Sequence, residues 1–114
     1  MLFDISKVDA DPKDENGQTA LYIAAKYGHK AVIKLLLNIS KVNINPKDRA
    51  GRTALHIVVE KGYKAVVKLL LDTGKVDVDL KDGARRTALH IAAKRGYEAV
   101  VKLLLDTGKV NANT

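Results

Sequence analysis

The sequence contains no cysteine and no tryptophan, and it has only one phenylalanine and two prolines. A chain without cysteine forms no disulfide bond, no thiolate metal site and no cysteine nucleophile. Long hydrophobic runs are also missing: none approaches the ~18 residues of a membrane span, and no secretory signal opens the chain. These absences predict an intracellular, cytoplasmic protein without a membrane segment.

The 114 residues have the composition of one small globular domain, with 46% hydrophobic and 29% charged residues. A domain of this size buries ~65% of the surface of its unfolded chain, which is enough for a hydrophobic core. Positive charge is in excess, because 20 lysines and arginines stand against 13 aspartates and glutamates, for a net charge of +7. Where this excess lies bears directly on function.

An internal repeat of 34 residues runs through the chain. Asp14 aligns with Asp48 and Asp82 at this offset, and the Thr-Ala-Leu and Leu-Leu-Leu segments recur in the same register. Residues 48–80 and 82–114 are identical at 22 of 33 positions. The chain therefore divides into a partial N-terminal repeat tail at 1–13 and three repeats at 14–47, 48–81 and 82–114.

Each repeat is predicted to fold as a turn, a helix, a second turn and a second helix. Thr19, Thr53 and Thr87 are good N-cap residues, because a threonine hydroxyl accepts a bond from an unpaired amide of the first helical turn. A glycine nine residues after each threonine is expected to end the first helix, since glycine adopts the left-handed conformation without strain.

The second helix carries three leucines in a row and is amphipathic. In the first repeat, Val32, Leu35 and Leu36 share one face by i, i+3, i+4 spacing and are predicted to be buried. Lys30 and Lys34 lie on the opposite face, toward solvent. Neither helix can bury its apolar stripe alone, so successive repeats must stack and share a core.

The repeat resembles the ankyrin repeat, whose Thr-Pro-Leu-His-x-Ala signature is matched by Thr87-Ala88-Leu89-His90-Ile91-Ala92. Alanine stands where the family has proline, and the period is 34 residues instead of 33, with the extra residue in the segment 75–81. The resemblance covers nearly the whole chain. It implies an all-α solenoid of stacked helix-turn-helix units with hairpin-like turns.

The turn of the third repeat departs from the other two. Gly17 and Gly51 align with Arg85, and a glycine stands two residues earlier, at Gly83. If the turn keeps the geometry of the other two, Arg85 adopts a backbone conformation that favours glycine, at a cost of about 1–2 kcal/mol. Alternatively, the turn is rebuilt around Gly83.

No constellation of residues favours catalysis or metal binding. His56 and His90 occupy equivalent positions but have no second histidine at the helical spacing of a metal site. The resemblance implies that this histidine ties the start of its helix to the neighbouring turn through hydrogen bonds. The two serines lie at predicted turns, and no glycine-rich phosphate loop is present. We therefore expect a protein that is not an enzyme and holds no metal or cofactor.

The resemblance places the partner-binding surface in a concave groove formed by the turn tips and the outer positions of the first helices. On this sequence the groove positions are Lys13, Glu15, Asn16, Gln18, Lys26, Tyr27, Lys47, Arg49, Ala50, Arg52, Glu60, Lys61, Lys81, Gly83, Ala84, Arg86, Lys94 and Arg95. Ten of them are basic and two are acidic, a net charge of +8, whereas the rest of the chain carries −1. The excess charge thus falls on the predicted binding surface.

A basic groove predicts a partner of acidic character, attracted over long range by the field of the groove. The resemblance makes this partner a protein or a peptide. Nucleic acid or another polyanion is the alternative class of ligand, because it would also bind through its negative charge. Single-strand binding normally adds aromatic stacking platforms, however, and Tyr27 is the single aromatic residue among the groove positions.

A further alternative is an engineered or truncated scaffold that assembles with itself into a homo-oligomer. The last repeat keeps the apolar residues of the inner repeats instead of the polar residues that usually close an array. Val58 and Val59 replace the Ala-Ala pair of the other repeats, although β-branched residues are not favoured in helices. We therefore predict that these two valines are available for contact between copies.

Overall fold

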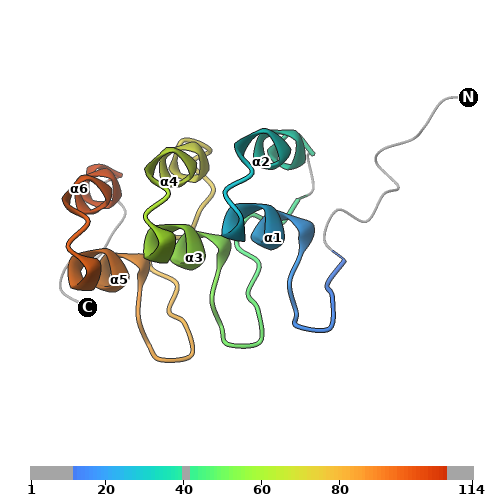
Figure 1. Ribbon diagram of the computed structural model, residues 1–114, viewed down its shortest axis with the longest axis horizontal. Helices are drawn as coiled ribbons and strands as arrows, with labels where there is room; N and C mark the ends of the chain where they lie inside the picture. The colour runs from blue at the N-terminus through green and yellow to red at the C-terminus, as the bar shows by residue number, and fades with distance from the viewer. Residues whose placement is uncertain (1–11, 40–41, 108–114) are drawn as a thin grey trace, which may run out of the picture.

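The computed structural model of the protein describes residues 12–39 and 42–107. Its helices have the following bounds: α1 Ala20–Lys26, α2 Lys30–Leu37, α3 Ala54–Lys61, α4 Lys64–Leu71, α5 Ala88–Arg95 and α6 Glu98–Asp106. Figure 1 shows α1, α3 and α5 in one row and α2, α4 and α6 in a second row, with three turns projecting from the first row in the same direction. The predicted all-α repeat architecture is confirmed.

The starts of α1, α3 and α5 are separated by 34 residues, which agrees with the period of the sequence. Within the described ranges there is no β-strand, and the hairpin character of the turns is limited to one isolated antiparallel bridge between Lys47 and Thr53. The predicted repeat tail at 1–13 lies outside the described residues except for 12 and 13. The final seven residues of the predicted third repeat also lie outside them.

The first helix of each repeat begins at its predicted threonine cap. The hydroxyl of each of these threonines accepts a hydrogen bond from the backbone N–H three residues ahead. In α3 and α5 the histidine at that position returns a bond, because its Nδ1 accepts from the backbone N–H of the threonine. This reciprocal pair is a capping box, and it satisfies two amides that the helix would otherwise leave unpaired.

The ends of the first helices follow the predicted glycines with one difference. Gly62 and Gly96 are left-handed C-caps of α3 and α5, each at φ +71°. In α1 the helix ends at Lys26 and Tyr27 is the cap, so that Gly28, at φ +69°, follows one residue later. The glycine is needed in all three repeats because the chain must reverse sharply into the second helix.

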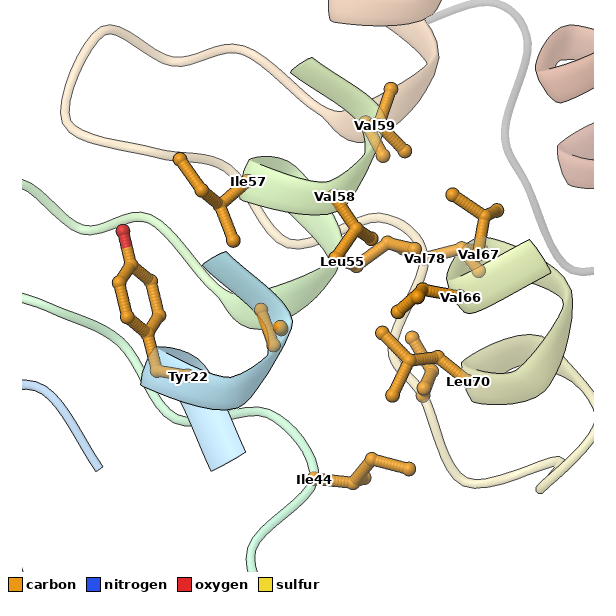
Figure 2. Close-up of a cluster of buried hydrophobic side chains, with 14 of the residues drawn as sticks. Tyr22, Ile44, Leu55, Ile57, Val58, Val59, Val66, Val67, Leu70 and Val78 are labelled. Carbon is orange, nitrogen blue, oxygen red and sulfur yellow. The ribbon is translucent and has the colours of Figure 1, made fainter. Parts of the chain in front are cut away.

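The hydrophobic core lies between neighbouring repeats. Helix α3 packs against both α1 and α5, and α4 packs against both α2 and α6. Figure 2 shows side chains of α3 and α4 in one cluster with Ile44 and Val78, which come from the connectors between repeats. Val76 and Val78 are buried while Asp77 between them is exposed, as expected for an extended connector. Each repeat therefore depends on its neighbours to complete its core.

The second helices bury a different set of residues from the one predicted in the first repeat. Ile33 is fully buried, whereas Val32 and Leu35 are exposed, Leu35 to 69%. Val66 and Val100, the equivalents of Val32, are buried in α4 and α6, each of which packs against the second helix of the preceding repeat. The prediction assumed a single buried face. A helix in the middle of the stack has two buried faces, one toward the preceding repeat and one toward the next. On α2, no described helix covers the face toward the preceding repeat.

Two buried side chains at equivalent positions tie successive repeats together. The Tyr22 hydroxyl donates a hydrogen bond of 2.7 Å to Oδ2 of Asp48, and Nε2 of His56 donates one of 2.8 Å to the carbonyl oxygen of Arg86. The tie predicted for the repeated histidine is therefore confirmed for His56. His90 is exposed, and its Nε2 bonds to no described residue.

His56 is held as a neutral imidazole by its partners. Its Nδ1 accepts the backbone N–H of Thr53 at 3.0 Å, while its Nε2 donates to a carbonyl oxygen, so the single proton must lie on Nε2. Burial lowers the pKa of His56, and the hydrogen bond to the carbonyl of Arg86 opposes this effect only in part.

The third turn keeps the geometry of the first two, and the alternative of a turn rebuilt around Gly83 is wrong. Arg85 has φ +62°, close to the +74° of Gly17 and the +77° of Gly51. The backbone N–H of each of these three residues donates a 3.0 Å bond to the carbonyl of the aspartate three residues earlier. Arg85 therefore occupies the left-handed region that a residue with a Cβ atom disfavours.

We expect Arg85→Gly to stabilise the protein. Glycine removes a left-handed strain of about 1–2 kcal/mol but gives the unfolded chain more freedom, which offsets about 0.4–1 kcal/mol. The middle of these ranges leaves a net gain of about 0.8 kcal/mol, which should raise the melting temperature by roughly 3–6 °C. Thermal denaturation followed by circular dichroism measures this rise. The matched control, Arg49→Gly, places glycine at a turn residue without positive φ and should not raise the melting temperature. An Arg85→Gly variant that melts at or below the wild-type temperature would contradict the strain.

We also expect the free energy of unfolding to fall when the pH drops below about 6.5, the ordinary pKa of histidine. The native state has the lower His56 pKa, so the unfolded state binds the proton first and is favoured as the pH falls. Urea denaturation at neutral and at mildly acidic pH measures this loss. It should shrink in His56→Gln and persist in the matched variant His90→Gln. An undiminished loss in His56→Gln would assign it to other groups.

Candidate functional site

The turns expose most of the residues predicted for the groove. A lysine precedes the turn aspartate in every repeat, and Lys13, Lys47 and Lys81 are all exposed. No ion pair forms between these lysines and any described residue. The three turns project side by side (Figure 1), and these lysines stand at the equivalent position of each turn.

A polar cavity of about 230 Å³ lies between the first and second turns. Five of the six residues that line it are predicted groove residues: Asn16, Gln18, Arg49, Ala50 and Arg52. The sixth is Asp48, which the sequence reasoning did not include. The structure therefore brings the predicted turn residues together, and it adds a carboxylate to them.

Asp48 organises the second turn. Its Oδ1 accepts the backbone N–H groups of Ala50 and Arg52, each at 2.9 Å. Its Oδ2 accepts the Tyr22 hydroxyl and also pairs with the Arg52 guanidinium at 2.9 Å. Only 8% of Asp48 is exposed. This carboxylate closes the turn, joins it to α1 and holds an arginine at the same time.

The charge state of this cluster follows from its contacts. Burial raises the pKa of Asp48, but the hydrogen bonds from the Arg52 backbone, the Tyr22 hydroxyl and the Arg52 guanidinium outweigh it, so the pKa is lowered overall. Burial, and then the bond to Asp48, raise the pKa of Tyr22 well above its usual range. Near neutral pH the cluster therefore holds an ionised aspartate beside a neutral tyrosine.

The third turn repeats this arrangement around Asp82. Its Oδ1 accepts the backbone N–H groups of Ala84 and Arg86, and its Oδ2 accepts Nε of Arg86 at 3.0 Å. The signal for these carboxylates was the aspartate that recurs in every repeat. With Asp14, Asp48 and Asp82 included, the net charge of the predicted surface falls from +8 to +5.

The helical part of the predicted surface lies at the C-terminal ends of α1, α3 and α5. Lys61 and Lys94 are exposed and form no ion pair with a described residue, whereas Arg95 pairs with Glu60 at 3.3 Å across α5 and α3. Lys26 stands over the Tyr27 ring at 5.7 Å, in a cation–π contact. The helices therefore add uncommitted lysines to those of the turns.

Tyr27 takes part in a second hollow, away from the turns. It is 60% exposed, and its ring stacks on that of His29 with a centroid distance of 6.1 Å. A cavity of about 350 Å³ separates Tyr27 from Tyr63, with Lys30 and Lys64 in its lining. The predicted residues thus divide into a turn group and a group at the helix ends.

Val58 and Val59 do not form the contact surface predicted for them. Both are fully buried within the core of the central repeat. This corrects the expectation of self-association through these valines. Both side chains belong to the hydrophobic core that α3 shares with the helices packed against it.

No group of three or more metal-ligating side chains gathers in residues 12–39 and 42–107. None of the six described helices has the length and apolar character needed to cross a membrane.

Comparison with known proteins identifies the repeat. The family model of ankyrin repeats in three copies matches residues 1–82 and 39–114, which together span the chain. A search of curated proteins finds no match. Ankyrin repeats are generally protein–protein interaction modules, and proteins built from them are typically not enzymes. On the shared signature, the stacked helix pairs and this match, the protein belongs to the ankyrin-repeat family.

Proposed function

We propose that the protein is a non-enzymatic binding module that holds an acidic protein or peptide on the basic surface of its turns and first helices. One observation carries this proposal. Lys47 and Lys81 at the turns, and Lys61 and Lys94 at the ends of α3 and α5, are exposed and form no ion pair with any described residue. None of these four ammonium groups takes part in an ion pair that stabilises the described fold, so their charge is available to a partner.

Two arginines of this surface, unlike the lysines, are paired with carboxylates. Arg52 and Arg86 hold the carboxylates that close their turns, so their charge is already matched. Attraction of an acidic partner therefore rests on the uncommitted lysines and on Arg49, which is exposed and forms no ion pair with a described residue. Uncommitted charges of one sign raise the rate of encounter with a partner of opposite sign, and salt weakens this effect.

A protein partner is favoured over nucleic acid by the shortage of exposed aromatic rings. Tyr27 is the one tyrosine among the described residues that is largely exposed. It stands at the helix ends and does not line the turn cavity. Single-stranded nucleic acid is normally held by several stacked bases, each on its own aromatic platform.

The proposal predicts that charge reversal on the lysines weakens binding of an acidic probe. In Lys47→Glu/Lys61→Glu/Lys81→Glu/Lys94→Glu, the affinity for a fluorescein-labelled oligoglutamate peptide should fall at least about tenfold at low salt. Fluorescence anisotropy measures this affinity. The matched control reverses four lysines outside the predicted surface that also form no ion pair with a described residue, Lys34, Lys64, Lys68 and Lys75, and changes the net charge equally. It should keep most of the affinity.

Three results would count against the proposal. Equal losses in the two variants would show that net charge alone attracts the peptide. Absence of binding by the wild-type protein would remove the acidic partner. Duplex DNA or heparin bound more tightly than the peptide at the same salt concentration would favour the polyanion alternative.

Self-association is the second candidate, supported by exposed apolar side chains on the second helices. Leu35 on α2 is 69% exposed and Leu105 on α6 is 45% exposed. Helices α2 and α6 stand at opposite ends of their row (Figure 1), so contact between copies would be end to end. Exposed leucines favour such contact because association removes them from water.

If copies associate in this way, the sedimentation coefficient should increase with protein concentration. Leu35→Asp should abolish the increase, because a charge at the contact opposes its burial. The control, Lys34→Asp, places the same charge on an adjacent residue. A coefficient that does not change with concentration in the wild-type protein would rule out this candidate.

A further inference from the structure

The third turn carries an exposed arginine at a position that requires a left-handed backbone. Arg85 has φ +62°, and it is the one residue other than glycine with positive φ among the described residues. Such conformations cost about 1–3 kcal/mol and persist where something else compensates or uses them. The side chain of Arg85 should therefore have a role that the described contacts do not provide.

The neighbouring glycine does not explain this arginine. The backbone N–H of Gly83 donates to the carbonyl of Ala50 at 2.8 Å, and a Cβ atom at Gly83 would lie 2.7 Å from that oxygen. At the equivalent place between the first two turns, the distance from Arg49 N to Asn16 O is 3.4 Å. Gly83 thus lets the third turn approach the second. This requires glycine at 83 and places no demand on residue 85.

Arg85 has no structural partner among the described residues. It is exposed, and no hydrogen bond or ion pair of its guanidinium is formed with them. A glycine there would remove the strain and leave the turn bonds unchanged, as Gly51 does in the second turn. The fold alone therefore favours glycine at this position.

Comparison of the two turns indicates what the arginine supplies. The second turn has two arginines: Arg52 is held by Asp48, and Arg49 is exposed and unpaired among the described residues. The third turn also has two, with Arg86 held by Asp82. Residue 83, the equivalent of Arg49, must be glycine. The uncommitted guanidinium of the third turn therefore stands two residues later, at Arg85.

We propose that Arg85 is a specificity-determining contact, whose guanidinium binds a carboxylate of the acidic partner at the third turn. This inference rests on the proposed function and names the residue that contacts the partner at the third turn. The planar guanidinium suits this role because it can donate two parallel hydrogen bonds to one carboxylate. The Arg85 guanidinium is exposed and can bind a partner, because Asp82 and Arg86 make the side-chain bonds that close the turn.

The test separates strain from charge with three variants of one residue. Arg85→Gly removes both the strain and the charge, Arg85→Asn removes the charge and tolerates the left-handed backbone, and Arg85→Lys keeps both. The control, Lys68→Gln, removes one charge from the second helix α4. Affinity for the fluorescein-labelled oligoglutamate peptide is measured by anisotropy at low salt, and the melting temperature is measured on the same samples.

Binding and stability should change in opposite directions. Arg85→Gly and Arg85→Asn should bind the peptide about two- to fivefold more weakly while melting at a higher temperature than the wild type. Arg85→Lys should melt like the wild type and lose less affinity than these two variants. Lys68→Gln should bind like the wild type. A gain in stability with a loss of binding is not expected of a residue with a merely structural role.

Two results would overturn the inference while leaving the proposed function intact. In the first, the wild type binds the peptide and Arg85→Gly and Arg85→Asn bind it equally well. In the second, Lys68→Gln loses as much affinity as they do, so that only net charge matters. A wild-type protein that does not bind the peptide would instead overturn the proposed function, and this inference with it.

Discussion

The stacking of one repeat on the next is the contact on which the rest of the structure depends. A pair of helices of seven to nine residues each is too short to be stable by itself. The core is completed when α3 is covered by α1 and α5, and the same holds for α4 between α2 and α6. The buried ties from Tyr22 to Asp48 and from His56 to the Arg86 carbonyl then fix the register between repeats. A surface shared by several turns can exist only because this register is set.

The turn aspartate links the fold to the site. Asp48 is nearly buried and ionised where it closes its turn, so the fold places a negative charge among the basic residues of that turn. Arg52 offsets that charge. A basic turn residue can therefore be structural, as Arg52 is, or uncommitted, as Lys47 is, and only the second kind contributes a net field toward a partner. A count of charges along the chain does not make this distinction.

The features that follow from repetition could be predicted from the sequence, and those that depend on neighbours could not. The 34-residue period and the threonine caps have local causes, so they were predicted correctly. Whether Val58 faces a partner or the core depends on the distance between α3 and its neighbours, which no local pattern contains. Leu35 was misjudged because a stacked helix has two buried faces. Asp48 was missed, although the aspartate recurs in every repeat, because its contacts with Tyr22 of the preceding repeat and with the Arg52 guanidinium arise only in the folded structure.

In the third turn, packing against the neighbouring turn and the local backbone conformation each favour a glycine, at two different residues. Close approach to the second turn requires a glycine at Gly83, and the left-handed backbone favours one at residue 85. The chain satisfies the first requirement and not the second. Gly83 meets the requirement imposed by packing. At residue 85 the chain carries an arginine although the left-handed backbone favours glycine. Selection for stability alone would reverse this outcome, because glycine at 85 relieves strain without loss of a described contact. Local violations of this kind concentrate where a protein meets other molecules. In this molecule the left-handed residue is the exposed Arg85, next to Arg86, whose charge is already paired with Asp82.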